Sequence, residues 1–75
     1  MKVVYEEYSE DRKRRFLIYN EETYFSVVLE QFYEELEIQG YIEPAGFKEV
    51  RDVMIHHVGT IEEGINVGRE LLTNI

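Results

Sequence analysis

The sequence predicts an α+β domain in which an N-terminal β-hairpin is followed by three helices (β-β-α-α-α). Residues 2–19 contain two short runs rich in Val, Ile and Tyr, a composition typical of strands. Residues 21–39 repeat apolar side chains at helical spacing. A capping motif at Thr60 then opens a last amphipathic segment.

The two predicted strands are Lys2–Tyr8 and Arg14–Tyr19, with a polar break between them. The run from Phe16 to Tyr19 is apolar on both faces, so one face packs against a helix and the other needs a different cover. Because a lone two-stranded hairpin is marginal in water, we expect the face with Leu17 and Tyr19 to meet a second copy or a partner strand. In this version, dimerisation completes the fold.

The first predicted helix spans residues 21–39. Asn20 is a good N-cap, and Gly40 is a typical residue just past a helix C-terminus. The segment carries an apolar stripe at helical spacing, which we expect to pack on the hairpin: Phe25, Val28, Leu29, Phe32, Leu36 and Gln39.

Residues 41–46 read as a connector, because they contain the single proline, Pro44. Two assignments are open for residues 47–58. The spacing of Phe47, Val50, Met54 and Val58 favours a helix, whereas residues 53–58 also fit a strand, which gives the alternative order β-β-α-β-α.

The last predicted helix begins after Thr60, whose side chain and Glu63 form a capping box. Its expected buried stripe consists of Ile61, Ile65, Gly68, Leu72 and Ile75. Gly64 and Gly68 permit another backbone to approach closely. That backbone belongs either to this domain or to a second copy across a dimer seam.

Size and charge restrict the function. The chain of 75 residues makes one small domain (residues 1–75), contains no cysteine, and has a net charge of −8 from 16 acidic and 8 basic residues. Such a balance argues against binding to nucleic acid or to an anionic membrane. No run approaches the ~18 apolar residues of a membrane span. We expect a cytoplasmic protein without a cofactor.

The negative charge is concentrated in one block. Between Phe16 and Gly46 there are seven acidic residues and no Lys or Arg. On the predicted helix, Glu30, Glu34 and Glu37 form one outward stripe beside Tyr33, and Tyr41 follows in the connector. Like charges at these spacings repel. The stripe is therefore read by a basic partner, kept as a solvated face for solubility, neutralised by Arg12–Arg15 of the same chain, or used to hold a cation.

Other candidate sites are weaker. The basic run Arg12–Arg15 is short for a nucleic-acid patch. Glu49, Asp52 and His56 share one stripe of the predicted helix and suggest a metal site as a minor hypothesis, but the adjacent His56 and His57 point apart and cannot chelate together. No Ser or Thr has a His at a readable spacing, so we expect no enzyme activity.

The prediction from sequence is a small acidic regulatory or inhibitor-like module that docks a basic protein surface through Glu30, Tyr33, Glu34, Glu37 and Tyr41. An obligate homodimer is the alternative, formed through Leu17 and Tyr19 or through Gly64 and Gly68. If the arginines of the hairpin fold back and neutralise these glutamates, the case for an external partner collapses.

Overall fold

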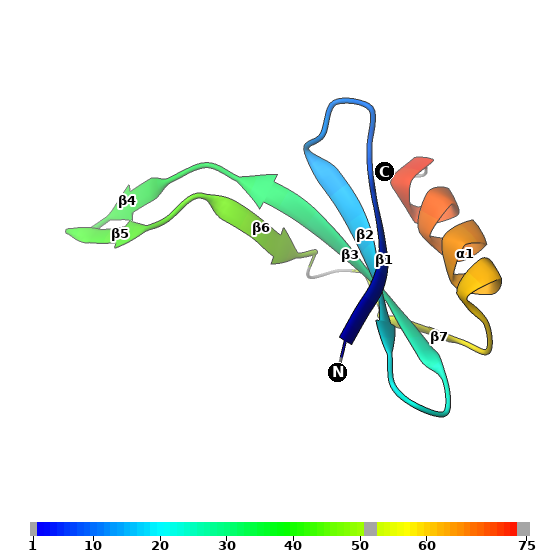
Figure 1. Ribbon diagram of the computed structural model, residues 1–75. Helices are drawn as coiled ribbons and strands as arrows, with labels where there is room; N and C mark the ends of the chain where they lie inside the picture. Colours follow the sequence, from blue (N-terminus) through cyan, green and yellow to red (C-terminus); the bar gives the residue numbers. More distant parts are fainter. Residues whose placement is uncertain (1, 51–52, 74–75) are drawn as a thin grey trace.

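The computed structural model describes residues 2–50 and 53–73 and consists largely of antiparallel strands (Figure 1). The elements in chain order are β1 (Lys2–Tyr8), β2 (Arg14–Asn20), β3 (Phe25–Tyr33), β4 (Leu36–Ile38), β5 (Tyr41–Glu43), β6 (Gly46–Glu49), β7 (His56–Val58) and α1 (Ile61–Thr73).

The central strand of the main sheet is β3. The strands β1, β2 and β3 are consecutive antiparallel neighbours. Two short strands share the far edge of β3: β6 pairs with residues 30–33, and β7 pairs with residues 25–27. The strands β4 and β5 form a separate two-stranded sheet that extends the β3–β6 hairpin away from the body (Figure 1).

This extension gives the molecule an elongated shape. The principal extents are 44 × 25 × 19 Å, and the Cα radius of gyration is 13.7 Å. A compact domain of this length has a radius of gyration of roughly 11 Å. The excess follows from the β4–β5 hairpin, which projects from the sheet on the side opposite α1 (Figure 1).

The hydrophobic core lies between α1 and one face of the sheet. Phe16 and Ile18 of β2 and Val27 of β3 are 0% exposed and form its centre. Side chains of α1 pack against them, with Tyr5, Phe25 and Val58 at the margin of the cluster: Ile65, Val67, Leu71 and Leu72. Full burial of such side chains is worth roughly 1.5–3 kcal/mol each, so this layer dominates the stability of the body.

Two glycines set the distance between α1 and the sheet. A Cβ atom at Gly64 would lie 2.9 Å from Cδ1 of Ile18, and one at Gly68 would overlap the ring of Phe16. Glycine inside a helix costs about 1 kcal/mol relative to alanine. Here that cost allows the helix backbone to rest directly on the core side chains.

The opposite face of the sheet is also largely covered in its centre. Leu17 of β2 and both Ser26 and Val28 of β3 are buried. Ile55, which precedes β7, lines the same hollow of about 300 Å³ as Tyr19 and Val28. Residues 26–29 of β3 are therefore buried on both faces, without the alternation of a half-exposed strand.

The predicted helix at residues 21–39 is wrong, because this segment forms β3 and β4. The spacing of its apolar residues fits a helix. A strand buried on both faces has no alternation of apolar and polar residues, so its sequence can show the same spacing. The β-branched and aromatic content of the segment favours a strand. Tertiary burial decides between the two.

The two residues taken as ends of that helix have other roles. Asn20 accepts a hydrogen bond through Oδ1 from the backbone N–H of Glu22 (2.8 Å), which closes the turn between β2 and β3. Gln39 and Gly40 have φ values of 52° and 80°. Positive φ at both central residues is the mark of a type I′ hairpin turn, so Gly40 ends β4 rather than a helix.

The second predicted helix is wrong as well. Residues 46–49 form β6, and residues 56–58 form β7. The competing assignment of residues 53–58 as a strand is correct for the last three residues. The expected connector at residues 41–46 contains β5 and the first residue of β6. The described residues therefore contain one helix instead of three, and both predicted orders of elements are wrong.

The N-terminal hairpin and the last helix are confirmed. The strands β1 and β2 lie where the Val- and Tyr-rich runs predict them. Thr60 caps α1, since its Oγ1 accepts a hydrogen bond from the backbone N–H of Glu63 (3.1 Å). These elements carry local signals that later packing does not override.

Candidate protein-binding arm

The projecting hairpin carries a group of exposed apolar side chains. We define the arm as residues 34–45, which comprise β4, the turn at Gln39-Gly40, β5 and the residues that join them to β3 and β6. Its ladder is short, with three residue pairs between β4 and β5. A two-stranded hairpin of this length cannot bury its own side chains.

Four large apolar side chains of the arm stay more than half exposed: Leu36 (53%), Ile38 (54%), Tyr41 (69%) and Ile42 (55%). Tyr33 at the base of the arm is also exposed. Scattered exposed apolar residues are ordinary, but several on one protruding element make it a candidate interaction surface.

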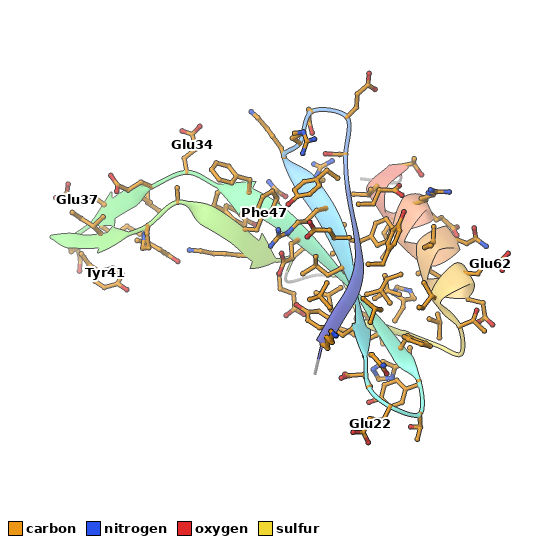
Figure 2. The ribbon with its side chains drawn as sticks, in the orientation of Figure 1. Glu22, Glu34, Glu37, Tyr41, Phe47 and Glu62 are labelled. Carbon is orange, nitrogen blue, oxygen red and sulfur yellow. The ribbon has the colours of Figure 1, made fainter. Side chains whose placement is uncertain are left out.

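The arm has two different faces. Directly paired residues share a face, so the pairs Leu36–Glu43 and Ile38–Tyr41 lie on one side and the pair Glu37–Ile42 on the other. Figure 2 shows Tyr41 on one side of the arm and both Glu34 and Glu37 on the other. We call the side with Leu36, Ile38 and Tyr41 the inner face and the opposite side the outer face.

The inner face leads into a hollow at the base of the arm. The hollow has a volume of about 700 Å³ and is lined from both strands of the long hairpin: Tyr33, Glu34, Glu35, Leu36, Glu43, Lys48, Glu49 and Val50. Lys48 forms an ion pair with Glu43 across it. The apolar side chains of the inner face therefore continue from the tip of the arm to its base.

The charge of the arm is entirely negative. It contains Glu34, Glu35, Glu37 and Glu43 and no basic residue. Lys48 neutralises Glu43. Within residues 2–50 and 53–73, the other three carboxylates form no ion pair or hydrogen bond. Their charges are available to a partner. Salt screens their interactions to the extent usual for exposed charges.

The predicted partner-binding residues are divided among three places. Tyr33 and Tyr41 lie on the inner side, whereas Glu34 and Glu37 are on the outer side (Figure 2). Glu30 lies in the body, on the face of the sheet that α1 does not cover. The single stripe of glutamates that a helix would present does not exist in the structure.

One arginine of the basic run does fold back, onto Glu30. Arg15 donates from Nε to Oε1 of Glu30 (2.7 Å) and from Nη1 to the hydroxyl of Tyr8 (3.1 Å). Its guanidinium group lies 4.2 Å from the centre of the Phe47 ring, a cation–π distance. This pairing removes Glu30 from the candidate surface but leaves the carboxylates of the arm untouched.

The residues predicted for dimerisation are mostly used inside the domain. Gly64 and Gly68 face the core, and Leu17 is buried. β2 has β1 on one edge and β3 on the other, so it offers no free edge to a second copy. Tyr19 is partly buried and lines the hollow with Ile55. A homodimer stays a prediction, and it would have to use other surfaces.

The histidines lie on opposite faces of β7, as adjacent residues of a strand must. His57 is opposite Ser26 and 4.8 Å from the ring of Tyr24, and His56 is opposite Val27. Asp52, the predicted partner of His56, lies outside the described residues. In the part of the chain that the structure describes, no three His, Cys, Asp or Glu side chains form a group that could hold a metal ion.

Sequence reasoning missed the apolar residues of the arm: Leu36, Ile38 and Ile42. A signal was present, because Gln39-Gly40 separates two short apolar runs in the manner of a two-residue hairpin turn. Gln is not among the usual first residues of that turn, and the helical spacing upstream predicts a helix that continues to Gln39.

Comparison of the chain with protein-family models, with curated proteins and with solved structures gave no match. The described residues include no helix with the length and apolar character that crossing a membrane requires. The candidate function therefore depends on the geometry and chemistry of the arm.

Proposed function

We infer that this protein is a small regulatory module of the inhibitor type, which binds a basic protein surface through its arm. The observation that carries the proposal is the exposure of Leu36, Ile38, Tyr41 and Ile42 on a projecting hairpin that carries acidic side chains and no basic ones. The rest of the domain holds this hairpin out from the sheet.

The apolar side chains are suited to supply the affinity. Binding energy at protein interfaces is concentrated in a few large side chains that become fully desolvated, and tyrosine is enriched among them. Tyr33 and Tyr41 lie at the base and the tip of the arm, and Leu36 and Ile38 lie between them. A partner with an apolar patch of matching size would bury all four.

The carboxylates are suited to supply orientation and speed of association. Complementary charge steers encounter and rejects wrong partners more than it adds affinity. Glu34, Glu35 and Glu37 lie on the same arm as the apolar residues and have no partner among the described residues. A surface rich in Lys and Arg around an apolar centre is therefore the complement of the arm.

The test is capture of a binding protein from native extract by the full chain. We expect the double variant Leu36→Asp/Tyr41→Asp to lose the captured protein, because it places charge where apolar contact is required. Met54→Asp is the matched control, since Met54 is 82% exposed and lies outside the arm. Circular dichroism and thermal unfolding of each variant establish that the body is intact.

The electrostatic part of the proposal has a separate test. The variant Glu34→Lys/Glu37→Lys should slow association and remove most of its dependence on salt. Glu30 is left unchanged, because its partner Arg15 lies in the same sheet. Capture that is equally strong with the arm carrying Asp at positions 36 and 41 would refute the proposal.

A further inference from the structure

The face of the sheet on which α1 packs continues past the helix into the arm. α1 covers this face where Ile18 and Val27 lie. Alternation along β3 places Tyr33 on the same face as Val27, and the hollow at the base of the arm joins Tyr33 to Leu36. A helix covers one end of this face, and within the described residues the other end is bare (Figure 1).

Charge decides against a second copy of α1 as the missing cover. α1 begins with Glu62 and Glu63 and has no basic residue in its last turn. Packed on the arm of another molecule, it would bring these carboxylates close to Glu34 and Glu35. Like charges placed side by side at an interface are unfavourable, so α1 of a second copy is a poor occupant.

The shape of the arm decides against an added strand. An added strand binds through the backbone of an edge, and β4 and β5 contribute three residues each. So short an edge offers few hydrogen bonds. Leu36, Ile38 and Tyr41 instead project from the inner face of the ribbon, as the core residues of the sheet project towards α1.

We propose that the inner face of the arm binds an amphipathic helix of another protein. The apolar stripe of that helix packs on Tyr33, Leu36, Ile38 and Tyr41, and its Lys or Arg side chains reach two carboxylates that line the hollow, Glu35 and Glu49. A helix of about 14 residues is roughly 21 Å long, comparable with the five or six residues of strand along the arm. The inference rests on the proposed function and deepens it by naming the class of segment recognised.

The test uses three synthetic peptides of about 18 residues that differ in one respect each. The first has a Leu stripe at helical spacing with Lys elsewhere, and the second replaces Lys by Glu. The third has the composition of the first in strict Leu–Lys alternation, which is the pattern of a strand. We expect the first to bind the full chain at least about tenfold more tightly than either other peptide, by fluorescence anisotropy.

The arm itself supplies a control for the face that is used. Leu36 is on the inner face and Ile42 is on the outer face, and the two are almost equally exposed. Leu36→Asp should weaken the first peptide about tenfold or more, whereas Ile42→Asp should change binding by less than about twofold. Amide chemical shifts in ¹⁵N-labelled protein should move at Tyr33, Leu36 and Ile38.

Three results would overturn the inference. Tightest binding of the alternating peptide means that the arm binds an added strand. Equal binding of the Lys and Glu peptides means that the charge of the peptide does not contribute to recognition. Sedimentation showing a dimer that Leu36→Asp dissociates means that the occupant is a second copy.

If extract capture still requires Leu36 and Tyr41 while the peptides fail to bind, the proposed function stands and the proposal of a helical partner does not. If capture is insensitive to both residues, the proposed function itself fails.

Discussion

The body (the main sheet and α1) and the arm both contain antiparallel strands, but their apolar side chains differ in burial. The strands of both carry large apolar residues. In the body, Ile18 is 0% exposed because β2 has a neighbour on each side and a helix above it, whereas Ile38 in the arm is 54% exposed. The number of packed neighbours, not the residue type, separates the part that stabilises the fold from the part available to a partner.

The largest expected effect comes from making the same change in both regions. Ile18→Ala should reduce the free energy of unfolding by about 2–5 kcal/mol, since it leaves a cavity in the core. Ile38→Ala should change it by no more than about 0.5 kcal/mol, as for other surface substitutions. Urea denaturation of the two variants measures the contrast. Similar losses at the two positions would mean that the arm is part of the cooperative core.

A smaller effect, confined to the arm, is expected at its turn. Gly40 has a φ of 80°, a conformation that costs an L-residue roughly 1–2 kcal/mol. Gly40→Val should therefore fray β4 and β5, seen as faster amide hydrogen exchange at Leu36 and Ile42. The exchange of amides in β2 should not change. Loss of protection in β2 would contradict the independence of the two regions.

The smallest effect concerns an ion pair that ties α1 to the edge strand of the body. Hydrogen bonds from Arg69 (3.0–3.1 Å) and then from Tyr5 (2.7 Å) lower the pKa of Glu7. Because the pKa of Glu7 is lowered in the folded state, the ionised carboxylate stabilises the fold at pH values above its ordinary pKa of 4.5. This stabilisation is lost as the pH falls through the folded-state pKa.

Glu7→Gln should therefore lower the urea midpoint at pH 7 by a small amount, as expected for an exposed pair. The difference from the unmodified chain should shrink as the pH falls through the lowered pKa of folded Glu7, because Glu7 is then protonated in both states. Glu43→Gln is the companion variant in the arm, where Lys48 is the partner. A difference that grows on acidification would show that the sign of the linkage is wrong.

Local signals predicted the N-terminal hairpin and the last helix. The Val- and Tyr-rich runs place β1 and β2, and the capping box at Thr60 places α1. The same kind of reasoning failed for residues 21–39. There the strand β3 lies between two neighbours and is buried on both faces, so its pattern does not alternate and imitates a helix.

The candidate site was predicted in part. The acidic character of residues 21–43 follows from composition, and Tyr33 and Tyr41 were selected for their type. Their location on one side of a ribbon, and the transfer of Glu30 to a pair with Arg15, depend on strand register. The sequence pattern places Leu36 on a buried helical stripe and Ile42 in a connector and gives Ile38 no role, because no sequence pattern states whether an apolar residue finds a neighbour.

From its amino acids alone, this chain is a small acidic domain with an N-terminal hairpin, a capped C-terminal helix and no basic residue between Phe16 and Gly46, since these properties depend on composition and on contacts a few residues apart. The tertiary structure determined that the middle segment forms strands, that Arg15 neutralises Glu30, and that the apolar side chains of the arm stay exposed. Burial is a property of neighbours distant in sequence, and it decided whether each apolar residue became core or surface.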